Sequence, residues 1–124
     1  MIAKIYINSD NIEEVECEGV VSEGYGLVAF RGEKHAWGYP ILRYTNLPVT
    51  VDIHKDNRYC SVGRTITGIG DKFDVDFYDA TGHKAREWHN CTDLTYINED
   101  AYSFWTGTEW VDVYGRVDIK VKVD

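Results

Sequence analysis

Apolar and polar residues alternate with a period of two in several segments of this chain, and no other feature constrains its fold as strongly. Near the C-terminus, Val117, Ile119, Val121 and Val123 alternate with charged residues. Because successive side chains of a β-strand point to opposite faces, this pattern is typical of a strand with one buried face. The same alternation occurs over 3–7, 15–17, 49–54 and 73–78. No window shows a persuasive 3.6-residue apolar period, so we predict no helix.

Turn-forming residues separate these segments. They gather at 8–11, 23–26, 45–48, 55–58, 67–71 and 79–82, where Gly, Pro, Asn and Asp favour tight turns. Further apolar runs predict strands at 25–31, 41–45, 58–66, 94–97 and 110–114. We therefore predict a single all-β domain over residues 1–124. Its architecture would be an antiparallel β-sandwich or barrel of about nine or more short strands joined by tight turns.

The charge balance bears on the partners that the chain can have. Its 124 residues include 21 acidic and 13 basic ones, a formal net charge of −8. Such a surface repels phosphate backbones, so we expect no direct binding to nucleic-acid polymers. It would steer the protein toward a basic protein partner, although an acidic balance also simply keeps a protein in solution.

The same composition indicates a compartment. No segment has the pattern of a signal peptide, and no apolar stretch is long enough to span a membrane. Cys17, Cys60 and Cys91 are odd in number and form no CxxC pair, which fits reduced thiols. We expect a cytoplasmic protein that does not contact a membrane.

The segment from Tyr102 to Val113 predicts a β-hairpin, because a short Gly-containing turn joins two aromatic-rich runs. Trp105 and Trp110 flank the turn and would pair across the two strands,. With Gly107 and Val111, these residues resemble the tryptophan-flanked hairpins of phage tail and fibre proteins. The resemblance covers about a dozen residues of the chain. It implies a structural role for the hairpin and a phage or mobile-element source.

Lys84, Arg86 and Trp88 are a candidate ligand-binding group. Their spacing of two places them on one face of a predicted strand,. Two cations and an indole suit a small anionic ligand with a flat ring, such as a nucleotide, whose phosphate would bind the cations while its base stacks on the indole. The alternative is an exposed face on which Lys84 and Arg86 pair with Asp74 and Asp76.

Metal and catalytic sites have little support in the sequence. Asp71, Asp74, Asp76 and Asp79 form an acidic group without the spacing of a calcium-binding loop,. His89 and Cys91, with Cys60 or His83, lack a second short-spaced pair of zinc ligands. No catalytic fingerprint is present, although abundant carboxylates leave a glycosidase-like pair open. We therefore expect no cofactor, no metal and no enzymatic activity.

Residues 31–39 predict a loop, since they contain two glycines and no regular pattern. Trp37 and Tyr39 lie within it. Aromatic side chains on such loops contact ligands in many sugar- and peptide-binding sandwiches. The alternative, which we favour from sequence, is that both side chains pack over one end of the core.

These observations predict a non-enzymatic binding or inhibitor protein. It would neutralise a host enzyme, or sequester an anionic nucleotide-like signal, as counter-defence and immunity proteins do. One alternative is a phage virion, tail or fibre protein that assembles as a homo-oligomer. Another is a carbohydrate-binding module that uses Trp37, Trp88 or Trp105 as a stacking platform.

Overall fold

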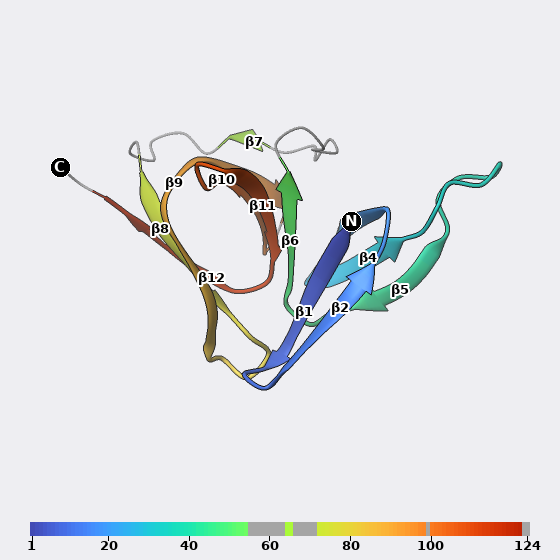
Figure 1. The fold of residues 1–124 in the computed structure, drawn as a ribbon, viewed down its shortest axis with the longest axis horizontal. Helices are drawn as coiled ribbons and strands as arrows, with labels where there is room; N and C mark the ends of the chain where they lie inside the picture. Colours follow the sequence, from blue (N-terminus) through green and yellow to red (C-terminus); the bar gives the residue numbers. More distant parts are fainter. Residues whose placement is uncertain (55–63, 66–71, 99, 123–124) are drawn as a thin grey trace.

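The structure is a computed structural model that describes residues 1–54, 64–65, 72–98 and 100–122. These residues form an all-β fold, which confirms the predicted class, and their ten strand pairings are all antiparallel (Figure 1). The described part of the chain contains no helix that could cross a membrane.

The strands in chain order are β1 (Ile2–Asn8), β2 (Asn11–Glu16), β3 (Gly19–Gly24), β4 (Leu27–Arg31), β5 (Ile41–Thr45), β6 (Val49–His54), β7 (Arg64–Thr65), β8 (Phe73–Tyr78), β9 (Lys84–Asn98), β10 (Ala101–Trp105), β11 (Glu109–Tyr114) and β12 (Val117–Val121). The alternation in the sequence thus marks β1, β6, β8 and β12 correctly. The predicted turns at 8–11, 23–26, 45–48 and 79–82 all connect strands. Those at 55–58 and 67–71, and most of the predicted strand 58–66, lie outside the described residues.

Two sheets make up the fold. The large sheet has the order β12-β8-β9-β10-β11-β6-β1-β2, with the short strand β7 paired to β9 beside this path. It curls round so that β9, β10, β11 and the connection from β11 to β12 outline a ring when the molecule is viewed as in Figure 1. The small sheet has the order β3-β4-β5 and lies on the outer side of β1 and β2.

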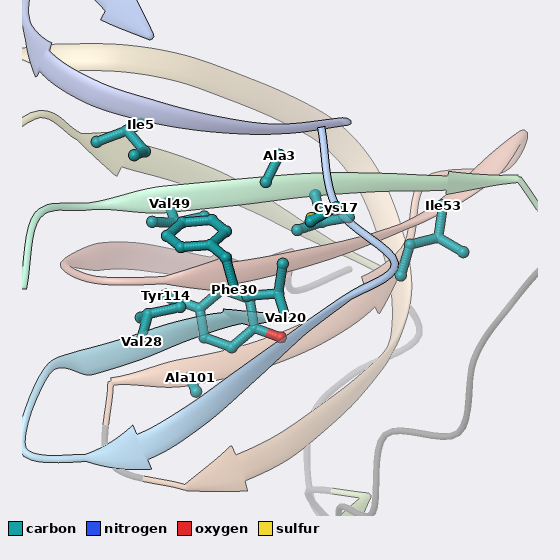
Figure 2. Close-up of a cluster of buried hydrophobic side chains, with 11 residues drawn as sticks. Ala3, Ile5, Cys17, Val20, Val28, Phe30, Val49, Ile53, Ala101 and Tyr114 are labelled. Atoms are coloured by element: carbon teal, nitrogen blue, oxygen red, sulfur yellow. The ribbon is translucent and has the colours of Figure 1, made fainter. Parts of the chain in front are cut away.

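One hydrophobic core lies between the two sheets. Figure 2 shows its side chains, which come from the small sheet, from β1, β6, β10 and β11, and from the connection between β2 and β3. The buried members are Ala3, Ile5, Cys17, Val20, Val28, Phe30, Val49, Val51, Ile53, Ala101 and Tyr114. Two sheets packed face to face over such a core have the layering of a β-sandwich.

A second core fills the concave side of the large sheet. Its buried members are Tyr6, Phe73, Val75, Phe77, Trp88, Cys91, Leu94, Phe104, Val111 and Val113. Several of these rings meet edge to face, for example Trp88 and Phe104 with ring centroids 5.2 Å apart. Because the large sheet is covered on both faces near its middle, alternate residues of one strand enter different cores.

The long strand β9 explains why one prediction was inaccurate. Residues 94–97 were predicted to form a strand of their own, but they continue the 15-residue β9. Asn90 and Asp93 both have a φ of 57°, and the pairing register of β9 with β8 and β10 shifts near them. These irregularities bring Trp88, Cys91 and Leu94, three residues apart, to the same buried side. They also bend the strand round the second core.

The predicted tryptophan hairpin is confirmed. Trp105 is the cross-strand partner of Trp110 in the pairing of β10 with β11. Their ring centroids lie 5.4 Å apart. The sequence pattern does not predict β3, whose segment contains adjacent valines and ends in glycine instead of alternating. Cys17 and Cys91 are free and buried, as expected of reduced thiols.

Candidate functional site

The connection between β4 and β5 projects away from both cores, and we name residues 32–40 the finger (Figure 1). At its tip, His35 and Gly38 form an isolated antiparallel bridge. The amide of His35 donates to the carbonyl of Gly38 at 2.8 Å, and the amide of Gly38 donates back at 3.0 Å. This geometry makes the finger a small hairpin with Ala36 and Trp37 in its turn. Gly38 has a φ of 116° there, a value that favours glycine,.

Trp37 is exposed at the tip of the finger. Its side chain has a relative exposure of 73%, and Tyr39 beside it has 49%. The expectation that these two rings pack over the core is therefore wrong, because the hairpin carries them away from the sheets. The indole is stacked on the imidazole of His35, with ring centroids 5.3 Å apart and an interplanar angle of 12°. The stacking on His35 thus holds the Trp37 indole in a solvent-exposed position.

The base of the finger is fixed to the small sheet. The amide of Gly32 donates to the carbonyl of Pro40 at 2.8 Å, and Nη1 of Arg31 donates to the carbonyl of Tyr39 at 3.2 Å. Gly32 is buried against Leu42, whose Cδ2 would lie 2.9 Å from a Cβ at that position. Hydrogen bonds at both ends and this close packing define where the tip points.

The predicted ligand group of Lys84, Arg86 and Trp88 does not share one exposed face. The register of β9 against β8 shifts between Phe77 and Tyr78. Lys84 pairs with Glu87 at 2.9 Å and lies 4.0 Å from Asp76. Trp88 is only 9% exposed and belongs to the second core. Arg86 and Trp88 do share a side of β9, since the guanidinium lies over the indole ring, whereas Lys84 lies with Asp76 and Glu87. The expected face common to all three residues is therefore wrong, while a ligand-binding role for any of them stays a prediction.

Arg86 is engaged inside the fold. Its Nη1 donates to the carboxylate of Asp52 at 3.1 and 3.2 Å and lies 3.4 Å from the hydroxyls of Tyr6 and Thr50. Its guanidinium lies over the Trp88 ring, 4.5 Å from the centroid. Burial lowers the pKa of Arg86, but these hydrogen bonds and the Asp52 charge outweigh it, so the pKa is raised. Asp74 and Asp76 were the expected partners of Arg86, whereas its described carboxylate partner is Asp52 of β6.

The acidic group of β8 is also paired. Asp76 accepts a hydrogen bond from Lys120 at 3.1 Å, and Asp74 lies 3.5 Å from Lys122. Asp71 lies outside the described residues. Among those described, no three His, Cys, Asp or Glu side chains gather as metal ligands do. Burial raises the pKa of the Cys91 thiol to about 11, and Cys60 lies outside the described residues.

A cavity of about 480 Å³ lies where several turns meet, between the connections at 46–48, 79–82 and 114–116. Asp79 lines it and is 5% exposed. Its Oδ1 accepts from the amide and hydroxyl of Thr81 and from the amide of His83. The Thr81 hydroxyl is the main cause of the lowered pKa of Asp79. Its Oδ2 is buried without a hydrogen bond to any described residue. The described hydrogen bonds of this carboxylate, all at Oδ1, hold the turn over residues 79–83.

Charge is distributed unevenly over the molecule. Residues 19–48, which hold the small sheet and the finger, contain two acidic and three basic residues, a net charge of +1. Subtracting these from the 21 acidic and 13 basic residues leaves 19 and 10 for the rest of the chain, a net charge of −9. The exposed aromatic residues of the finger thus lie on the least acidic part of the molecule.

No protein-family model matches this chain, and neither curated proteins nor solved structures show a significant match to it. The sequence indicates that the residues of the finger form a loop but does not indicate that their side chains are exposed. A glycine-flanked Ala-Trp pair between two strands was the available signal, since it predicts a tight hairpin turn.

Proposed function

We propose that this protein is a non-enzymatic binding protein of the inhibitor type, and that the finger inserts into a recess on a protein partner. The observation that carries the proposal is Trp37, which is 73% exposed at the tip of a hydrogen-bonded hairpin. Tryptophan is among the residue types most enriched at interface positions that dominate the binding energy. A solitary exposed indole of this kind fits an anchor that is buried on binding.

The local structure supports this use of the finger. The backbone bonds between His35 and Gly38 and the stacking of His35 on Trp37 order the tip before any partner binds. Association costs free energy for each side chain that must be immobilised, roughly 0.5–1.5 kcal/mol for a flexible one. A tip that is already ordered avoids part of this cost. Loops of this kind suit the blocking of a recessed site.

The charge distribution favours a partner with a basic surface. The body of the protein carries a net charge of −9, while the region that holds the finger is close to neutral. An apolar anchor surrounded at a distance by negative charge would dock best into an apolar recess on a positively charged protein. An enzyme that acts on nucleic acid has such a surface, so neutralisation of a host enzyme by a phage or mobile-element protein is the version we favour.

Sequestration of a nucleotide-like anion has less support. Glu87 and Asp76 engage Lys84, and Asp52 engages Arg86. An anion would have to replace these carboxylates and would find Trp88 buried. A carbohydrate-binding module remains an alternative because Trp37 could stack on a sugar ring. A virion or tail protein is a further alternative, because the Trp105 hairpin resembles the tryptophan-flanked hairpins of phage tail and fibre proteins.

Site-specific photo-crosslinking tests the proposal. A photo-reactive benzoylphenylalanine replaces Trp37 in one variant and Thr108, an exposed residue of the β10–β11 turn, in a matched control. Both proteins are produced in the cells of origin and irradiated. We expect a protein adduct that forms at position 37 and not at position 108.

The affinity of the crosslinked partner, once purified, then decides the role of the indole. Loss of an interface anchor costs 2 kcal/mol or more, which corresponds to a dissociation constant about 30-fold higher for Trp37→Ala. Tyr25→Ala removes an even more exposed ring, 93% against 73% for Trp37, from another turn and should leave the affinity unchanged. Equal affinity of Trp37→Ala and the native protein, or an adduct only at position 108, would reject the finger as the binding element.

A further inference from the structure

Among the strands that the structure describes, one edge strand lacks the usual protection against pairing with another chain. The strand orders place β12 and β2 at the edges of the large sheet and β3 and β5 at those of the small sheet. Edge strands present unpaired backbone N–H and C=O groups, and proteins protect them with charges, short length or a covering segment. The strand β7, which pairs only with β9 among the described strands, is protected by its length of 2 residues, and the other four edges can be examined in turn.

Three edges are protected. β2 carries Glu13, Glu14 and Glu16, and β12 carries Asp118 and Lys120. β3 is tied to the large sheet, because the Ser22 hydroxyl donates to Oδ1 of Asn98 at 2.7 Å and Nδ2 of Asn98 donates to the Ser22 carbonyl.

The free edge of β5 differs from these three. Its sequence is Ile-Leu-Arg-Tyr-Thr, and β4 is its only partner among the described strands. Arg43 is the single charged residue, and its guanidinium is bound to the carboxylate of Glu13 at 2.5 Å. No free charge of β5 therefore opposes the approach of a second strand.

The side chains of β5 add an exposed apolar surface to this edge. Ile41, Leu42 and Tyr44 are 41%, 56% and 52% exposed. Tyr44 is paired with Ala29, which is paired with Val21, so these three residues form a row across one face of the small sheet. Val21 is also exposed, at 39%. An apolar row that reaches an unprotected edge is typical of a sheet that continues into another chain.

The charge distribution indicates that a second copy of this chain can pair with the free edge of β5. A partner strand from a second copy brings another body with a net charge of −9, and the two bodies repel each other at most surfaces,. Residues 19–48 are the exception, with a net charge of +1. Two copies that meet at β5 place neutral, apolar surfaces in contact and keep the acidic bodies apart.

We propose that β5 pairs antiparallel with β5 of a second copy, so that two small sheets form one six-stranded sheet across a two-fold axis. An antiparallel pair of identical strands is self-complementary, as a two-fold interface requires. The finger leads directly into β5, so the dimer would present two fingers from neighbouring positions. Two linked anchors would raise the apparent affinity for a partner with two sites. The dimer itself does not depend on the proposed function of the finger.

Sedimentation equilibrium of the purified chain over about 1–200 µM tests the dimer. The native protein should approach twice the chain mass of 14.3 kDa. Tyr44→Lys and Ile41→Lys should each raise the dimer dissociation constant at least tenfold. Tyr25→Lys makes the same change at a 93% exposed position of the β3–β4 turn and should leave that constant unaltered. Circular dichroism and the melting temperature establish that each variant is folded.

The dependence of the dimer dissociation constant on salt concentration gives a second test, and the direction of the change is predicted. Because two negatively charged bodies are brought together, higher ionic strength should tighten the dimer by screening their repulsion. A native protein that stays monomeric at 200 µM would overturn the proposal. So would a dimer that tolerates both β5 substitutions, since another surface would then hold it together. Trp37→Ala should leave the dimer intact, which separates this test from that of the finger.

Discussion

At the scale of single residues, Arg86 shows how a charge can be held inside this fold. Its guanidinium contacts Asp52, Tyr6 and Thr50 and covers the Trp88 ring. Replacing it with alanine leaves the partly buried carboxylate of Asp52 without its cation. Hydrogen bonds to charged groups contribute about 1.5–3 kcal/mol. We expect Arg86→Ala to lower the free energy of unfolding by about 1–3 kcal/mol, measured by urea denaturation.

Lys84→Ala is the matched control for Arg86→Ala. Lys84 is half-exposed and pairs with Glu87 on the surface, where such ion pairs contribute about 0–1 kcal/mol. Its removal should barely change the urea midpoint. If Arg86→Ala is as mild as Lys84→Ala, then the network around Arg86 contributes nothing to stability and the guanidinium is available for a ligand.

Asp79 gives a prediction for the effect of pH on stability. The hydrogen bonds from Thr81 and His83 lower its pKa in the folded state below the ordinary value of 3.8. A carboxyl group with a lowered folded pKa stabilises the fold above its unfolded pKa and loses this effect as the pH falls through the folded pKa. Asp79→Ala should therefore melt at a lower temperature than the native protein at pH 7. The gap should narrow below about pH 4.

Thermal melts of both proteins between pH 2.5 and pH 7 test this expectation. Thr108→Ala, on an exposed turn far from Asp79 in sequence, serves as a control that should show no such trend. A constant difference across the whole range would mean that Asp79 acts through packing alone and not through its charge.

At the scale of elements, β9 contains two residues, Asn90 and Asp93, with a positive φ that is rare in strands. Asp93 has a φ of 57°, a conformation that costs most residues about 1–2 kcal/mol and glycine almost nothing. Asp93→Gly should therefore be more stable than Asp93→Ala by about 1 kcal/mol. Both variants lose the hydrogen bond from the Thr92 hydroxyl, so their difference isolates the backbone. Equal stabilities in urea would show that the bend of β9 does not need this conformation.

Such bends also limit what the sequence reveals about the elements. The period-two pattern predicts β1, β6, β8 and β12, because apolar residues occupy every second position in each of these segments. In β9, by contrast, Trp88, Cys91 and Leu94 are three residues apart and share one side. A pattern of that kind does not indicate a strand. β3 has no alternation because glycine and serine take positions where apolar residues would mark a buried face.

At the scale of the whole molecule, the site could be predicted only in part. The sequence places Trp37 and Tyr39 in a loop, but their exposure depends on where the hairpin projects relative to both cores. The partner of Arg86 is Asp52, 34 residues away along the chain, and no local pattern indicates that contact. The free edge of β5 likewise results from the order of strands, which the sequence does not contain. The class of the fold was predictable, whereas the surface that it exposes was not.

The central claim is that the finger is the surface that binds the partner. Hydrogen–deuterium exchange, measured on the protein alone and in complex with the partner found by crosslinking at position 37, tests it most directly. We predict that slowed exchange is concentrated in residues 33–40, with the amides of Ala36 and Trp37 at its centre. Protection that falls instead on β8, β9 and β12, with the finger unchanged, would contradict this account and return attention to the charged face around Lys84.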